Sequence, residues 1–218
     1  MDASLTGVGA PWPARSDAPP AMPGEAAELA RLAGEVPLAP RVWIPAEAEE
    51  AFYRLNHLPP RLRELFAPIA SRDPDEDDIE DIAPAARDLL ARHALLDSWV
   101  DAFYDAVAPL PDRVRVRRPG TPGRTAARGR PALLALRAVW AEAWSDAAVT
   151  ARLRATGSVA LDAAPVLIHD AEDASAAPEL AARVAEVLGT PTAVAARDDG
   201  AVTRLGSAAR PVGGGAES

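Results

Sequence analysis

Residues 166–205 read VLIHDAEDASAAPELAARVAEVLGTPTAVAARDDGAVTRL. An apolar strand pattern at 166–168 is followed by a helix pattern that ends at Gly189. A second strand pattern, 192–205, is divided by Asp-Asp-Gly, which favours a hairpin turn. This order predicts a small C-terminal β-α-β-β unit. We expect strands 166–168 and 192–196 to lie parallel, as in a βαβ unit.

The sequence before this stretch is mainly helical. Apolar residues recur at helical spacing in five segments, which are 25–33, 45–57, 60–70, a long helix from about 73 to 107, and 131–154. Short strands are predicted at 42–44 and 159–161, and Val114 and Val116 alternate with arginines as in an exposed strand. The predicted fold class is therefore α+β, with a mostly helical body and the small C-terminal unit.

Composition shifts divide the chain into four parts. We predict a disordered, proline-rich leader at 1–24, a helical domain at 25–157 with an arginine-rich strand and loop at 113–130, a small strand, helix and hairpin unit at 158–206, and a disordered tail at 207–218. Trp12 lies in the leader between two prolines, which favours docking onto a partner.

Composition also excludes several classes of chemistry. The chain of 218 residues contains no cysteine, and all its basic residues are arginine or histidine. Disulfides, thiolate nucleophiles and a phosphate-binding lysine are therefore impossible. A net charge of −9 argues against nucleic acid or an anionic membrane as a partner. We expect a cytoplasmic protein, and the bias toward alanine and arginine is typical of a GC-rich bacterial genome.

Charge is distributed very unevenly along the chain. Residues 73–105 contain eleven acids and two arginines, whereas residues 113–130 contain seven arginines and no acid. These segments either neutralise each other or form two interaction surfaces. The predicted anion-binding residues are Arg115, Arg117, Arg124, Arg128 and Arg130.

The acidic run has one spacing that can hold a metal. Asp77, Asp78 and Asp81 match the Asp-Asp-x-x-Asp pattern of Mg²⁺ sites, but in so acidic a run a chance match is expected. No metal and no cofactor is predicted.

Two histidines lie beside aspartates at spacings that allow contact. His93 and Asp97 are four residues apart in a helical pattern, and His169 precedes Asp170 at the end of an apolar strand. Each pair is a candidate for proton transfer by histidine with aspartate as its orienter. The alternative for the first pair is a core histidine bonded to Asp97, and for the second a strand end followed by capping residues.

Two classes of function remain open. The first is an accessory or interaction subunit that binds a partner protein or peptide, with a bacterial biosynthetic enzyme complex as the setting that we expect. The alternative is a small enzyme that holds an anionic, phosphate- or carboxylate-bearing small molecule with arginines and uses a His/Asp pair for acid–base chemistry. A helix-turn-helix DNA binder at 46–70 is disfavoured by the acidic composition.

Overall fold

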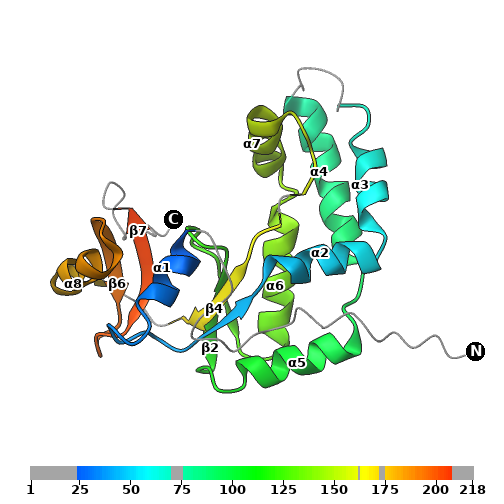
Figure 1. Ribbon diagram of the computed structural model, residues 1–218. Coiled ribbons are helices and arrows are strands. Elements are labelled where there is room, and N and C mark those ends of the chain that lie inside the picture. Colours follow the sequence, from blue (N-terminus) through cyan, green and yellow to red (C-terminus); the bar gives the residue numbers. More distant parts are fainter. Residues whose placement is uncertain (1–23, 70–75, 162, 172–174, 208–218) are drawn as a thin grey trace, which may run out of the picture.

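The computed structural model describes residues 24–69, 76–161, 163–171 and 175–207 (Figure 1). Helices and strands are mixed along the chain, and the fold class is α+β, as predicted. The elements in chain order are α1 (Glu25–Arg31), β1 (Arg41–Ile44), α2 (Ala46–Leu55), α3 (Leu58–Leu65), α4 (Glu76–Ala91), α5 (Asp97–Val107), β2 (Arg113–Arg117), β3 (Arg124–Ala127), α6 (Arg130–Glu142), α7 (Asp146–Thr156), β4 (Val166–Asp170), β5 (Ser175–Ala176), α8 (Pro178–Leu188), β6 (Thr192–Ala196) and β7 (Val202–Ser207).

Four strands from distant parts of the chain form an antiparallel sheet in the order β1-β4-β2-β3. The hairpin between β2 and β3 depends on Gly123, which has φ +72°. A Cβ atom at this position would lie 2.2 Å from Cβ of Arg117, so only glycine fits. The hairpin therefore packs closely against the end of β2.

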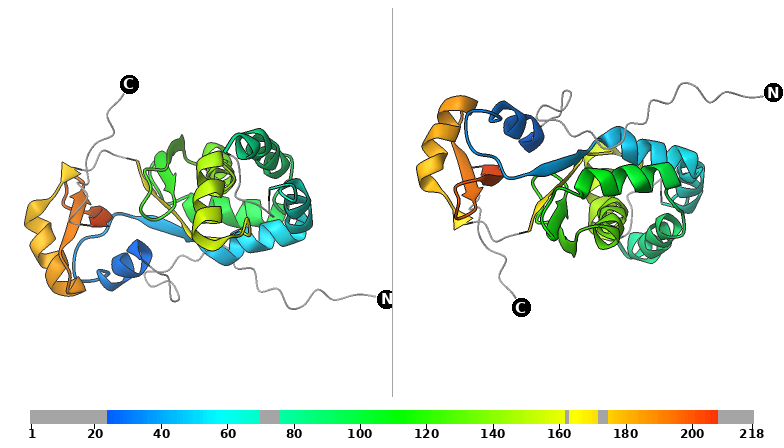
Figure 2. Two further views of the ribbon diagram at one scale, coloured as in Figure 1. Left: turned by 90° about the horizontal axis from the view of Figure 1, so that it is seen from above. Right: turned by 90° about the horizontal axis from the view of Figure 1, so that it is seen from below.

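The two faces of this sheet pack against two different hydrophobic cores, because side chains alternate along a strand. One face carries Val42, Val116 and Ile168 into the core of the helical body. The opposite face carries Trp43 and Leu167 into a second core with α1, α8, β6 and β7. Figure 2 shows the sheet between the helical body and the small C-terminal unit.

The helical body is built around aromatic residues. Phe52 and Tyr53 of α2 contact Trp140 and Trp144 of the α6 region, and Phe66 stacks on Trp144 with ring centroids 5.4 Å apart. The indole Nε1 of Trp144 donates a hydrogen bond to the Tyr53 hydroxyl at 2.6 Å. Aromatic packing of this kind contributes beyond the area that it buries.

The predicted C-terminal β-α-β-β unit is present, but its first strand is β5. Strands β5, β6 and β7 form a three-stranded antiparallel sheet, and α8 packs against β6. The hairpin of β6 and β7 confirms the prediction for 192–205. The parallel βαβ arrangement is wrong, because β4 belongs to the other sheet. Residues 159–161 also form no strand and run as an irregular segment.

Strand β2 is not an exposed strand, contrary to the prediction. Val114 and Val116 are fully buried, and the strand lies between β3 and β4. The alternation of valine and arginine reflects two different environments on the two faces of the sheet.

Both long predicted helices are interrupted. Residues 92–96 separate α4 from α5, and Arg137 donates to the carbonyl oxygens of Leu90, Ala91 and His93 at this break. Those carbonyls would otherwise lack partners where a helix ends. Residues 143–145 separate α6 from α7, and the Ser145 hydroxyl caps α7 by accepting from Ala148 N.

Candidate functional site

Two neighbouring arginines at the end of β2 point to opposite faces of the first sheet. Arg117 pairs with Glu25 of α1, and Arg118 pairs with Glu49 of α2. Both carboxylates are buried. The Arg117–Glu25 pair therefore connects α1 to one face of the sheet, and the Arg118–Glu49 pair connects α2 to the opposite face.

Glu25 is surrounded by hydrogen-bond donors. Arg117 donates from Nη1 and Nη2 at 2.6 and 2.7 Å, and the main-chain N–H groups of Gly120 and Leu205 donate at 2.9 and 3.0 Å. Burial alone would raise the pKa of Glu25, but Arg117 and these N–H groups hold it below its usual value. The carboxylate is therefore charged and fully engaged.

His169 of β4 lies beside this pair and is 5% exposed. Arg117 Nε donates to His169 Nε2 at 3.0 Å. Burial, with the charges of Arg117 and Arg41, lowers the pKa of His169 to about 3. The imidazole is therefore neutral near pH 7, and its proton lies on Nδ1 because Nε2 is the acceptor.

Further arginines gather on this side of the sheet. The register places Arg41 of β1 and Arg115 of β2 directly opposite His169, one on each side. Arg204 of β7 is close enough to feel the charges of Arg117, Glu25 and Arg115. We call these residues the arginine layer: Glu25, Arg41, Arg115, Arg117, His169 and Arg204. The layer thus contains four guanidinium groups and one carboxylate, and only Arg117 forms an ion pair with that carboxylate among the described residues.

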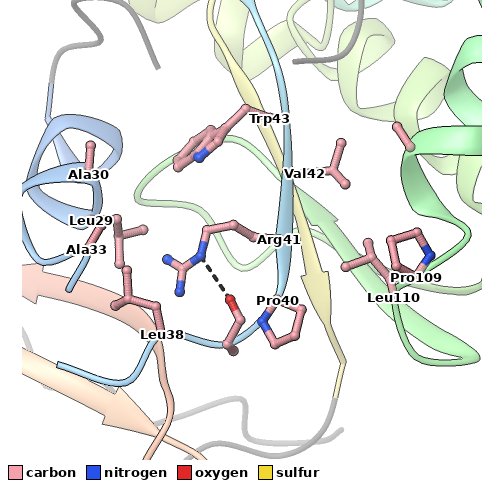
Figure 3. Close-up of a pocket in the computed structure, with 12 residues that line it drawn as sticks. Leu29, Ala30, Ala33, Leu38, Pro40, Arg41, Val42, Trp43, Pro109 and Leu110 are labelled. Atoms are coloured by element: carbon pink, nitrogen blue, oxygen red, sulfur yellow. Dashed lines mark hydrogen bonds between the residues drawn. The ribbon is translucent and has the colours of Figure 1, made fainter. Parts of the chain in front are cut away.

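Arg41 also reaches a pocket of about 390 Å³ at the edge of β1, which we call the edge pocket (Figure 3). Arg41 is the only charged residue that lines it among those the structure describes; the other walls come from α1, residues 38–43 and residues 106–110. Its Nε and Nη2 donate to the carbonyl oxygens of Ala39 and Val202. Nη1 is buried and has no hydrogen-bond partner within the described ranges. Burial, with the charge of Arg117, lowers the pKa of Arg41 to about 10.

A second pocket, of about 540 Å³, lies in the helical body between α2, α3, α7 and residues 157–161. Tyr53 and Trp144 line it, together with apolar residues such as Leu62 and Leu153. Glu49 lies one helical turn before Tyr53, and its burial raises its pKa to about 7 despite Arg118. Glu50 and Arg63 also line it, but no buried polar side-chain atom without a hydrogen-bond partner does so among the described residues.

The structure does not bring the predicted His/Asp pairs together. Asp170 lies on the opposite face of β4 from His169 and forms an ion pair with Arg197 at 2.5 Å. His93 follows the end of α4, where its ring nitrogens contact Leu89 O at 2.7 Å and Arg61 Nη1 at 3.4 Å. Asp97 is exposed in the first turn of α5. The expectation that His93 bonds to Asp97 is therefore wrong.

The predicted anion-binding arginines are dispersed. Arg115 and Arg117 belong to the arginine layer, whereas Arg124 pairs with Glu142 on the surface. Arg128 donates to the carbonyls of Ala108 and Leu110 and to Asp112. Arg130 is the exposed first residue of α6.

Trp12 lies outside the described residues. Within the described ranges, no group of three or more histidines and acids has the geometry to hold a metal ion.

Three residues of the site were missed at the level of sequence: Glu25, Arg41 and Arg204. One signal pointed to a missing acid. Arg113, Arg115 and Arg117 alternate with valines and must share one face of a strand. A buried face with several arginines requires a carboxylate from elsewhere. Nothing in the sequence shows that this carboxylate is Glu25.

No helix in the described part of the chain is both long and apolar enough to cross a membrane. Comparison with known protein families finds no family model that matches the chain, and a search of curated proteins finds no significant match. The functional inference therefore depends on the geometry of the arginine layer and the edge pocket.

Proposed function

We propose that this chain is a non-catalytic binding subunit whose edge pocket holds an acidic segment of a partner protein. The observation that carries the proposal is the guanidinium of Arg41. In the part of the chain that the structure describes, it is the only charged group lining the pocket, and its Nη1 has no hydrogen-bond partner there. A buried donor without an acceptor is costly, so a ligand that supplies an oxygen there gains a strong, charge-assisted bond.

The pocket's walls support a segment with apolar residues beside the acid. Leu29 of α1, Leu38 and Leu110 line it from three different parts of the chain. Its volume of about 390 Å³ is near the lower end of the range for ligand sites. A pocket of this size fits one or two side chains, as in the recognition of a short peptide segment.

The enzyme alternative receives less support from the geometry. His169 is neutral, buried and already bonded to Arg117, which leaves its basic nitrogen without access to a substrate. Within the described residues, no hydrogen bond joins His93 to Asp97, and His93 is bonded to Leu89 instead. General acid–base catalysis needs a proton-transfer group within reach of the reacting atom.

Selection from a library of displayed random peptides tests the proposal. We expect the wild-type protein to enrich peptides with an Asp, a Glu or a free C-terminal carboxylate between apolar residues. Synthetic versions with the amide in place of the acid should bind at least about tenfold more weakly, since they lose a hydrogen bond to a charged group.

Two variants locate the binding site. Arg41→Gln should abolish the preference for acid, whereas Arg113→Gln should keep it, because Arg113 is exposed on the same face of the sheet but lies outside the pocket. Enrichment of peptides without an acid, or equal acid preference in both variants, would contradict the proposal. We expect the natural partner to belong to a cytoplasmic biosynthetic enzyme complex, and an affinity for the selected motif within such a protein would identify it.

A further inference from the structure

We propose that the arginine layer contains an oxyanion site in which Arg41 Nη1 and His169 Nδ1–H bind a carboxylate or phosphate group. This inference rests on the proposed function for the natural source of the oxyanion, which is the acidic side chain of the docked partner segment. The two donor atoms, Arg41 Nη1 and His169 Nδ1, do not depend on that proposal.

The protonation of His169 makes Nδ1 a donor. Arg117 Nε always carries its hydrogen and points it at His169 Nε2, so Nε2 must be the unprotonated nitrogen. The neutral ring therefore has its hydrogen on Nδ1. A hydrogen bond with the main chain of Asp170 acts on the ring and opposes the lowering of its pKa. Within the described residues, Nδ1 has no acceptor at normal hydrogen-bond distance and angle.

The second unpaired donor comes from the neighbouring strand. Arg41 and His169 are direct partners in the β1–β4 ladder and lie on the same face of the sheet. Cβ atoms of such partners are about 4.5–5.5 Å apart. Two adjacent side chains therefore each contribute a buried donor without an acceptor. A buried polar group left unpaired can indicate a missing water, ion or ligand, and here two such groups come from side chains that are neighbours across two strands.

Charge distinguishes an anion from water at this position. Among the described residues, no ion pair involves Arg41, Arg115 or Arg204, while Glu25 is fully engaged with Arg117 and two main-chain N–H groups. A water molecule would accept from both donors and leave the excess of positive charge unchanged. An oxyanion accepts from both donors and also offsets that charge.

Access to the layer is available from the edge pocket. The Arg41 guanidinium reaches the pocket between α1 and Leu38 (Figure 3). Arg115 and Arg204 are partly exposed, so the layer is not sealed from solvent on their side. His169 does not itself line the edge pocket, but it is the partner of Arg41 in the β1–β4 ladder. We therefore expect a carboxylate in the edge pocket to meet Arg41 first.

NMR of the full chain with ¹⁵N-labelled histidine tests the site directly. The three histidines give separate ring signals. Acetate, inorganic phosphate and chloride are titrated at constant ionic strength. We expect a saturable shift of His169 Nδ1 with acetate or phosphate, no such shift with chloride, and no shift of His57 or His93. Saturation by phosphate but not acetate would assign the site to a free phosphate, and saturation by acetate to a carboxylate group.

Variants separate this site from general charge effects. Arg41→Gln should weaken the apparent affinity for the oxyanion about tenfold or more, while Arg113→Gln should leave it within about twofold. If Arg41→Gln does not fold, the wild-type titration alone decides. A His169 signal that does not respond to either oxyanion, or responds equally to chloride, overturns the inference.

The same titration distinguishes failure of the two proposals. Saturable oxyanion binding without any peptide selected by the edge pocket would retain the site and reject the partner segment. Peptide binding that depends on Arg41 but leaves the His169 signal unchanged would retain the proposed function and reject the two-donor site.

Discussion

The two faces of the four-stranded sheet contain the same kind of ion pair in different electrostatic states. Arg117 and Arg118 are consecutive residues, and each binds a buried glutamate. The pKa of Glu25 lies below its usual value, whereas burial raises the pKa of Glu49 to about 7. Burial raises both values, and it acts more strongly on Glu49, which is the more deeply buried of the two.

The two carboxylates also differ in the number of hydrogen-bond donors that they receive. Glu25 accepts from two nitrogens of Arg117 and from two main-chain N–H groups. Glu49 accepts from a single side-chain nitrogen, Arg118 Nη2. Its only main-chain donor among the described residues is Ala164 N, at a long 3.4 Å. Hydrogen bonds to the charged form lower a pKa and can outweigh burial. A buried Glu–Arg pair is thus not sufficient by itself to keep the carboxylate charged.

Removing the charge of Glu25 should have the largest effect on stability. Glu25→Gln leaves the fully buried Arg117 without a carboxylate, and breaking a buried pair in this way costs about 3–5 kcal/mol. Urea denaturation followed by tryptophan fluorescence measures the loss. Glu28→Gln, on the same helix but outside the layer, is the control and should change stability by less than about 0.5 kcal/mol. A loss for Glu25→Gln similar to that of the control would show that Glu25 does not hold Arg117.

The two glutamates should also give opposite pH dependences. Folded Glu49 keeps its proton up to about pH 7, whereas the unfolded chain loses it near the usual value of 4.5. Between these values the folded state binds more protons, so the free energy of unfolding falls as pH rises, by up to about 3 kcal/mol. Glu25 has a lowered pKa, so its contribution is present above 4.5 and is lost only as pH falls through its folded pKa.

Unfolding measured from about pH 5 to pH 8 in wild type and Glu49→Gln isolates this contribution. The difference between the two proteins should change with pH, and the variant should lose the decline that Glu49 causes. Parallel curves for the two proteins would show that the pKa of Glu49 is not raised.

Neutral hydrogen bonds on the helical face should contribute less. Tyr53→Phe removes the acceptor of the buried Trp144 Nε1–H, which lies 2.6 Å from the hydroxyl. An unsatisfied buried donor of this kind costs about 1–2 kcal/mol. Thermal and urea unfolding would detect the change, with Tyr104→Phe, at a partly exposed position, as a control near zero. If Tyr53→Phe and Tyr104→Phe lowered the free energy of unfolding equally, the hydrogen bond between Tyr53 and Trp144 would not be the cause of the loss.

Sequence patterns predicted the elements whose contacts are close together in the chain. The hairpin of β6 and β7 follows from its turn, where Gly200 has φ +79°. The pairing of β4 did not follow, because its partners β1 and β2 are distant in sequence. An apolar run buried on both faces is typical of a parallel strand. Here β4 is antiparallel, and the helical body and the small unit cover its two faces instead of crossover helices.

The candidate site was predictable only in part for the same reason. Arg115, Arg117 and His169 were identified from residue type and position. Arg41 and Glu25 were not, since their roles depend on strand pairing and on the packing of α1. Among the described residues, the arginines of 113–130 form ion pairs with Glu25, Glu49, Asp112 and Glu142, none of which lies in the acidic segment 73–105. Charge runs in the sequence did not reveal which charges meet.

The smallest effect is expected for a surface pair that has the same length as the buried one. Arg124 and Glu142 are 2.6 Å apart, as are Arg117 and Glu25, but their side chains are 52% and 49% exposed. Water and ions screen an exposed pair, so Arg124→Gln should cost less than about 1 kcal/mol and should cost almost nothing at about 1 M salt. A double-mutant cycle with Glu142→Gln, at low and high salt, measures the coupling. A coupling free energy as large as that of Arg117 and Glu25 would mean that the N–O distance determines the strength of these ion pairs. A small, salt-sensitive coupling would mean that exposure to solvent and the number of surrounding donors determine the strength.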